Sequence, residues 1–168
     1  MSDALEDLVR SYRRLSADVG SRVNFACDAS SEDAFSLALR EKDHLDQAFF
    51  VLCFAALEKQ INLLASARQS EAMRITAMRE AKFEQRVDAA IKVAIEVLGS
   101  QPEWANKSSE IDNWYDIRND VAHGEPPTVS FEVPTVVDLA TKIAVTLEEV
   151  KTRSVSAKSA IETATEES

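Results

Sequence analysis

A run of large apolar residues in the middle of the chain constrains the fold more than any other feature. Five of them recur at spacings of four, three, four and three, the period of one helix face: Phe50, Phe54, Leu57, Ile61 and Leu64. Residues 49 and 51–53 are apolar as well. Because a helix that is apolar all round is buried all round, the run predicts a central helix. It lies either in the middle of a bundle or between two subunits.

The helical pattern around this run is long. It follows a Ser/Asp-rich connection at residues 27–31, with Ser31 as a candidate N-cap, and continues to about Gln69. Glu58 comes directly after the run, either as a surface charge at the edge of the core or as a buried acid with a partner. We favour the surface charge, because a glutamate is almost never buried unpaired.

Further helices are predicted on both sides of the central one. Amphipathic spacing indicates helices over 3–19, ending near Gly20, and over 80–98, ending at Gly99. Residues 100–103 fit a capping box, and a helix restarts at residue 108 or 109 and ends at 123. Residues 128–133 look extended, and Pro134 opens the last helix. The segment 66–80 either continues the long helix or folds back.

These elements define the expected fold class. The chain has 168 residues, of which three are glycine and four are proline, and 45% are apolar, which is typical of one helical domain. The sequence therefore predicts an all-α fold, an up-down bundle of about five helices in residues 1–150. Residues 151–168 are predicted to form a polar, partly disordered C-terminal tail.

Cysteine use and the N-terminus indicate a cytoplasmic protein with no membrane partner. Cys27 and Cys53 form no CxxC pair, so we expect both to be reduced and structural. The acidic N-terminus does not resemble a signal peptide. The longest apolar run, 49–57, is far shorter than the ~20 residues of a membrane-spanning helix.

The charge of the chain counts against a nucleic acid partner. The net charge is −10, and a field of that sign opposes the approach of a polyanion. The charge is uneven, because residues 66–100 hold 6 basic and 5 acidic side chains whereas residues 101–168 hold 6 and 13. A local basic surface is therefore compatible with the sequence.

The end of the helix over 109–123 carries the clearest motif. Arg118 and Asn119 precede His123 by five and four residues, and a glycine and two prolines follow the histidine. With the aromatic pair Trp114-Tyr115 upstream, residues 114–124 resemble the signature helix of the HEPN superfamily. The apolar residues 49–58 resemble that family's other characteristic helix, and the resemblance covers about residues 40–150.

The resemblance implies a HEPN-like bundle that dimerises so that two copies of the motif face each other. Many members are metal-independent endoribonucleases of toxin or anti-phage systems. On that template His123 is the acid or base for the ribose 2′-hydroxyl or the leaving oxygen, Arg118 stabilises charge on the phosphate, and Asn119 positions the phosphate or the histidine. The implied partners are a second copy, an RNA substrate and a cognate antitoxin or regulatory protein.

Elementary chemistry is consistent with these roles. An imidazole transfers protons near neutral pH without a metal, and a guanidinium matches phosphate oxygens with paired hydrogen bonds. At 100° per residue, however, Arg118 and His123 are about 140° apart on a regular helix, whereas Asn119 and His123 share a face. The site therefore needs a loosened helix end or a second subunit.

Other interpretations remain open. Arg118 can pair with Asp116 or Asp120 and His123 can cap the last carbonyls of its helix, in a catalytically silent module that dimerises and binds a partner or nucleotide. His44 fits a solvated helix face. The chain has no GxGxxG, Gly-x-Ser-x-Gly or His-Glu-x-x-His motif, and it has one Glu-x-x-His, Glu41 to His44, rather than the pair that a di-metal bundle needs, so we predict no cofactor and no metal site.

Overall fold

The computed structural model describes residues 3–29, 31–67, 81–125 and 132–166. Within these ranges the chain forms five α-helices and one 3-10 helix, with no strand, so the fold is an all-α helical bundle. The elements are α1 (Asp3–Asp28), α2 (Glu32–Ala65), α4 (Phe83–Leu98), η1 (Glu103–Lys107), α5 (Ser108–Ala122) and α6 (Val133–Glu166). Most of the segment that we expected to be extended, 128–133, lies outside the described residues.

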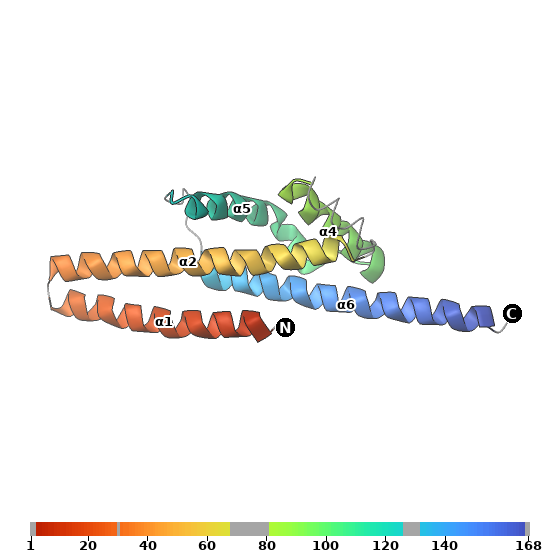
Figure 1. Ribbon diagram of the computed structural model, residues 1–168, viewed down its shortest axis with the longest axis horizontal. Helices are drawn as coiled ribbons and strands as arrows, with labels where there is room; N and C mark the ends of the chain where they lie inside the picture. The colour runs from red at the N-terminus through yellow and green to blue at the C-terminus, as the bar shows by residue number, and fades with distance from the viewer. Residues whose placement is uncertain (1–2, 30, 68–80, 126–131, 167–168) are drawn as a thin grey trace.

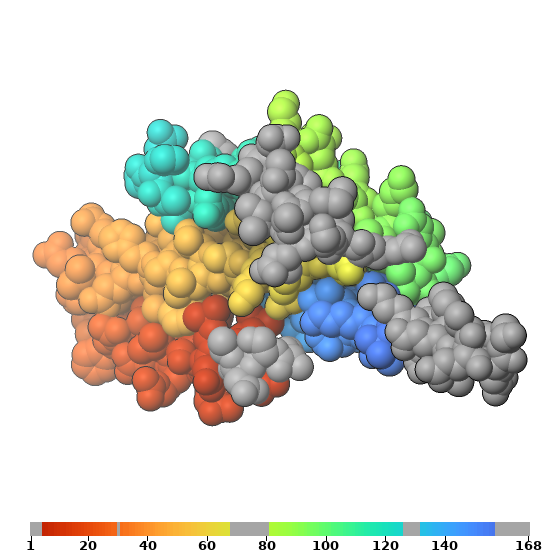
Figure 2. All heavy atoms as spheres, turned by 45° about the vertical axis from the view of Figure 1, so that its right-hand side comes forward, coloured from red at the N-terminus to blue at the C-terminus, as the bar shows by residue number. Residues whose placement is uncertain are grey.

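Helix α2 lies at the centre of the bundle. Helix α1 runs back along its first half, and α6 lies on the same side of α2 and extends beyond it (Figure 1). Helices α4 and α5 lie on the opposite side of α2 (Figure 1), and in Figure 2 α2 again lies between α5 and α1. Each of the other four α-helices contacts α2.

The predicted stripe on α2 forms the core. All five of its residues are fully buried, as is Cys53. The prediction that α2 is buried all round is wrong, however, because Leu52 is 52% exposed. Among the described helices, α2 is the one whose length and composition would also suffice to span a membrane, a test that the core helix of a soluble protein passes too.

Several predicted helix ends are confirmed. The side chain of Ser31 accepts a hydrogen bond from the backbone N–H of Ala34 at the start of α2. Gly99 ends α4 with φ +79°, in the left-handed region that favours glycine. Helix α6 begins at Val133, next to Pro134.

Two predicted helix ends are wrong. Helix α1 does not end near Gly20 but continues to Asp28. Val19 and Ala26 are both buried, so their contacts offset the ~1 kcal/mol that a glycine costs inside a helix. Helix α2 ends at Ala65, before the predicted Gln69, which lies outside the described residues together with the rest of 68–80.

The structure between α4 and α5 also differs from the prediction. Ser100 does not cap a helix, because Pro102 occupies the N-cap position of the short η1. The indole N–H of Trp104 in η1 donates to the hydroxyl of Thr146 in α6 over 3.0 Å. This buried hydrogen bond connects η1 to the core and explains why Trp104 is almost completely buried.

The backbone of α6 continues past residue 150 as far as Glu166. No glycine or proline follows Pro134 in the sequence, so nothing interrupts the helix. Two side chains bond back to carbonyls one turn earlier, from Thr152 to Glu148 and from Ser156 to Thr152. Helix α6 therefore extends well beyond the predicted helical domain.

The central position of α2 predicts different costs for two leucines of the same helix. Leu57 is fully buried and Leu52 is 52% exposed, so we expect Leu57→Ala to lower the free energy of unfolding by about 2–5 kcal/mol and Leu52→Ala by less than about 1 kcal/mol. Chemical denaturation followed by circular dichroism measures both values. Equal losses in the two variants would contradict this packing.

Candidate functional site

Helix α5 carries the segment 118–123 and is held by one apolar face. Ile111, Trp114 and Ile117 follow one another at a spacing of three and are buried. Since α5 packs against α2 and α4, this face fixes the orientation of the whole helix. The motif residues lie on the remaining, more exposed part of its surface.

Helix α5 ends where Gly124 in the sequence predicted that it would. His123 is the C-cap residue, and its backbone N–H donates to the carbonyls of Asn119 and Asp120 over 3.0 and 3.1 Å. Gly124 follows with φ +79°, and the N–H of Glu125 donates to the carbonyl of Asp120 over 2.9 Å. These bonds satisfy carbonyls that a helix end otherwise leaves without partners.

Arg118 lies half-buried and contacts its neighbour in the sequence. Its Nη1 donates to Oδ1 of Asn119 over 2.9 Å, and its Nε is buried without a hydrogen-bond partner among the described residues. No ion pair forms between Arg118 and Asp116 or Asp120, so the structural role that we considered for Arg118 is not observed within the described part of the chain. The guanidinium keeps donors for another acceptor.

His123 is exposed. Its backbone caps the helix, but no hydrogen bond joins its imidazole to Arg118 or Asn119, all three being described residues. The structure thus brings Arg118 and Asn119 together and leaves the imidazole of His123 at the surface. This arrangement agrees with the angular separation of Arg118 and His123 on a helix.

The surroundings of the motif are acidic. Helix α5 holds four carboxylates and one basic side chain, Arg118. Burial raises the pKa of Asp112, and the negative charges of Glu84, Asp88 and Asp116 raise it further. One carboxylate oxygen of Asp112 is buried without a hydrogen-bond partner among the described residues. The surface formed by α4 and the middle of α5 is therefore strongly negative.

Sequence reasoning missed an ion pair between α2 and α4. Nη1 of Arg86 donates to Glu58 over 3.1 Å and to the side-chain oxygen of Asn62 over 3.0 Å. The side chains of Glu58 and Arg86 are only 20% and 12% exposed. Glu58 is therefore a partly buried acid with a partner, closer to the second interpretation than to a free surface charge.

The same arginine connects α4 to α5 through aromatic rings. The guanidinium carbon of Arg86 lies 5.1 Å from the ring centre of Phe83, and Phe83 stacks on Tyr115 of α5 with the ring centres 4.5 Å apart. The sequence offered one signal for this contact, namely that Arg86 follows Phe83 by three residues in a predicted amphipathic helix. Sequence spacing does not reveal which residue of another helix it faces.

The remaining candidate groups have structural or solvent-exposed positions. Both cysteines are free thiols, and burial raises the pKa of Cys53 to about 11. His44 is exposed on α2, as expected for a solvated face. Within the described ranges, no group of three or more His, Cys, Asp or Glu side chains is placed to hold a metal ion.

Comparison with protein-family models, with curated proteins and with solved structures finds no match. The likeness to HEPN proteins therefore rests on the residues of α2 and α5.

The Glu58–Arg86 ion pair predicts measurable coupling. In a double-mutant cycle of Glu58→Ala and Arg86→Ala we expect a coupling free energy of about 0.5–3 kcal/mol. The exposed pair Glu148–Lys151, whose side chains are 69% and 52% exposed, is the control and should couple by less than about 1 kcal/mol. Chemical denaturation measures both coupling free energies. Similar values for the two pairs would show that burial does not strengthen the Glu58–Arg86 pair.

The raised pKa of Asp112 predicts a pH-dependent gain in stability when its charge is removed. Because the folded state raises this pKa, Asp112 binds a proton more readily in the folded protein than in the unfolded chain. At a pH above both pKa values the carboxyl is ionised, and its charge disfavours folding. Asp112→Asn should therefore raise the melting temperature at neutral pH, and the gain should shrink as the pH falls toward the ordinary carboxyl range, about 4.

The control for this experiment is Asp43→Asn, at an exposed carboxylate of α2, which should leave the melting temperature almost unchanged at each pH. A loss of stability at neutral pH in Asp112→Asn would contradict the prediction.

Proposed function

We propose that this chain is a metal-independent endoribonuclease of the HEPN type, working in a toxin or anti-phage system. The observation that carries the proposal is the placement of the motif at the end of α5. Arg118 is bonded to Asn119 over 2.9 Å, and His123 is exposed at the helix terminus. A phosphate diester can reach both groups from solvent.

Arg118 is suited to a phosphate because no carboxylate of the described residues neutralises it. Asn119 engages one Nη1 donor and holds the guanidinium close to the surface of α5. A guanidinium has five N–H donors, and two parallel ones match two oxygens of a phosphate. Arg118 therefore stabilises the charge that gathers on the phosphate oxygens during cleavage.

The reaction is the attack of a ribose 2′-hydroxyl on the adjacent phosphorus. The hydroxyl loses its proton to a base, the new bond from the 2′-oxygen to phosphorus forms, and the bond to the 5′-oxygen of the next nucleotide breaks. That oxygen takes a proton from an acid and leaves as a 5′-hydroxyl, so the other product ends in a 2′,3′-cyclic phosphate. His123 supplies one of these two proton transfers.

In an in-line displacement the attacking 2′-oxygen and the leaving 5′-oxygen lie on opposite sides of phosphorus, so one imidazole at a fixed position does not serve both as base and as acid. His44, the second histidine of the chain, lies on α2 rather than on α5. A homodimer that places two copies of residues 118–123 across one cleft supplies both imidazoles. We therefore propose a cytoplasmic homodimer as the active form.

The second candidate function is a catalytically silent HEPN-like module that binds a partner. One observation favours it, namely the acidity of the surface that carries the motif. Helix α5 holds four carboxylates and a single arginine, and the charges of Glu84 and Asp88 of α4 act on its Asp112. A field of this sign weakens the binding of RNA and favours a basic partner, such as a cognate antitoxin or regulatory protein.

The test is cleavage of RNA in the presence of EDTA. We expect cleavage to persist, and we expect His123→Ala and Arg118→Ala to lower its rate by about 100-fold or more, the usual cost of losing a proton-transfer group or an electrostatic stabiliser. His44→Ala is the matched control, since it removes an exposed histidine from α2, and it should cleave at the rate of the unmodified chain.

Two outcomes would contradict the proposal: activity that depends on added metal, or variants that fold and cleave as well as the unmodified chain. If no RNA is cleaved and His123→Ala alters only the binding of a protein partner, the silent module is the correct function.

A further inference from the structure

Helix α1 is too short to cover the whole of α2. With 26 and 34 residues and a rise of 1.5 Å per residue, the two helices are about 39 and about 51 Å long. Helix α1 lies along the first part of α2 only, and α6 lies along the rest of that side (Figure 1). Beyond the N-terminal end of α1, a space beside α6 lies along the extended axis of α1.

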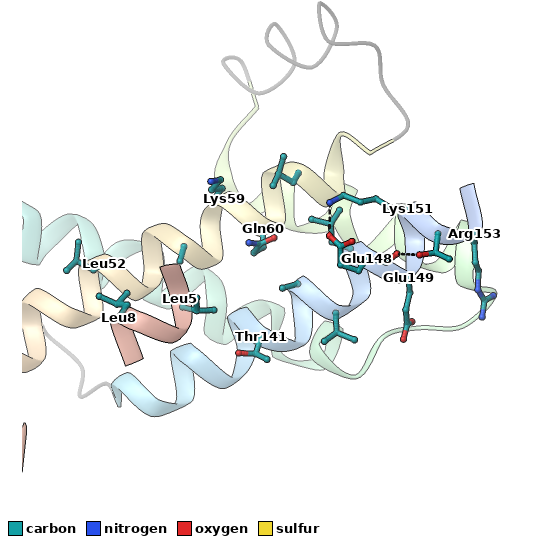
Figure 3. Close-up of a pocket in the computed structure, with 16 residues that line it drawn as sticks. Leu5, Leu8, Leu52, Lys59, Gln60, Thr141, Glu148, Glu149, Lys151 and Arg153 are labelled. Carbon is teal, nitrogen blue, oxygen red and sulfur yellow. Dashed lines mark hydrogen bonds and ion pairs between the residues drawn. The ribbon is translucent and has the colours of Figure 1, made fainter. Parts of the chain in front are cut away.

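This space is an apolar groove of about 1080 Å³ between α2, α6 and the start of α1. Figure 3 shows Leu5 and Leu8 of α1 at one end, with Leu52 beside them on α2. Two apolar side chains on its walls are accessible, since Leu52 and Val145 are 52% and 55% exposed. Exposed apolar area of this kind indicates a docking surface.

The charges at the rim of the groove differ from those of the chain as a whole. Three basic side chains and two carboxylates line it, on a chain whose net charge is −10. Lys151 is bonded to Glu148 over 2.7 Å, and Arg153 donates to the carbonyl of Leu98. Lys59 forms no ion pair with the described residues, so its charge is available to an acidic partner.

The opposite end of the molecule exposes a second apolar surface. At the turn between α1 and α2, Phe25 is 75% exposed and Leu37 is 59% exposed. We call this end, residues 25–29 and 31–37, the hairpin tip. Its charged residues are Asp28, Glu32 and Asp33, all exposed, and it has no basic residue. Behind it Arg22 pairs with Asp18 and Glu41, so the tip itself remains negative.

We infer that the groove of one copy binds the hairpin tip of a second copy. The two surfaces are apolar, they lie toward opposite ends of the same chain, and their charges are complementary, with acids around the tip and an excess of basic groups around the groove. The bound tip would lie in line with α1 and bury Phe25 and Leu37 against Leu52 and Val145. A contact between two different surfaces of the same chain is head-to-tail, and it forms a ring or a filament.

This contact is independent of the proposed function. Neither surface includes a residue of α5, which lies on the other side of α2 (Figure 2). Head-to-tail assembly would therefore leave the segment 118–123 uncovered. Loss of assembly without loss of RNA cleavage, or the reverse, separates the two proposals.

The experiment is sedimentation analysis over a concentration series with two single variants. Phe25→Glu damages only the tip and Val145→Glu damages only the groove, and both replace exposed side chains. We expect the unmodified chain to assemble beyond a dimer as its concentration rises. Neither variant alone should assemble beyond the dimer, because its head-to-tail association is weakened by about 30-fold or more, as for the loss of an anchor residue.

Mixing the two variants gives the decisive result. Each retains one intact surface, so an equimolar mixture should again assemble beyond the dimer. Ile95→Glu is the control, because Ile95 is an exposed apolar residue of α4 outside both surfaces, and it should assemble like the unmodified chain.

Three outcomes would overturn the inference. If Phe25→Glu still assembles beyond the dimer while Val145→Glu does not, the groove binds the groove of another copy instead. If the mixture of variants does not assemble beyond the dimer, the two surfaces do not bind each other. If the unmodified chain does not exceed a dimer at any concentration, the groove does not bind a second copy.

Discussion

The burial of one face of α2 is the interaction on which the rest of the structure depends. Its five stripe residues are fully buried, and each of the other four α-helices contacts α2. Helices α4 and α5 both pack on this face. The ring centre of Phe54 of α2 lies 5.6 Å from that of Phe83 in α4 and 6.3 Å from that of Tyr115 in α5. The position of α5, and with it Arg118 and His123, therefore follows from the packing on α2.

The sequence predicted the parts of the fold that depend on local chemistry. Periodicity identified the buried stripe of α2, and the side chain of Ser31 and the backbone of Gly99 set helix ends as expected. Predictions failed where contacts between distant segments decide the outcome. Gly20 does not end α1, because packing against α2 outweighs its intrinsic cost. Glu58 is paired because Arg86 reaches it from another helix, which no local pattern reveals.

In the candidate site too, the features set by local chemistry were predictable and those set by contacts between side chains were not. The end of α5 at Gly124 was predictable from its backbone requirement. The bond between Arg118 and Asn119 and the acidity shared between α4 and α5 were not, because rotamers and neighbours across helices decide them. Two features now oppose each other: an arginine without a carboxylate partner favours phosphate, while the surrounding carboxylates disfavour a polyanion. A second copy of the motif would add a second guanidinium and a second imidazole, together with the carboxylates of its own α5.

Analysis of the ends of the RNA products is the most direct test of this account. If the 2′-hydroxyl is the nucleophile, the purified chain should leave a 2′,3′-cyclic phosphate on one fragment and a 5′-hydroxyl on the other. Replacing the single 2′-hydroxyl next to the cleaved phosphate by hydrogen should then abolish cleavage at that position. A 5′-phosphate on the product, or undiminished cleavage of the 2′-deoxy substrate, would contradict the proposed role of Arg118 and His123.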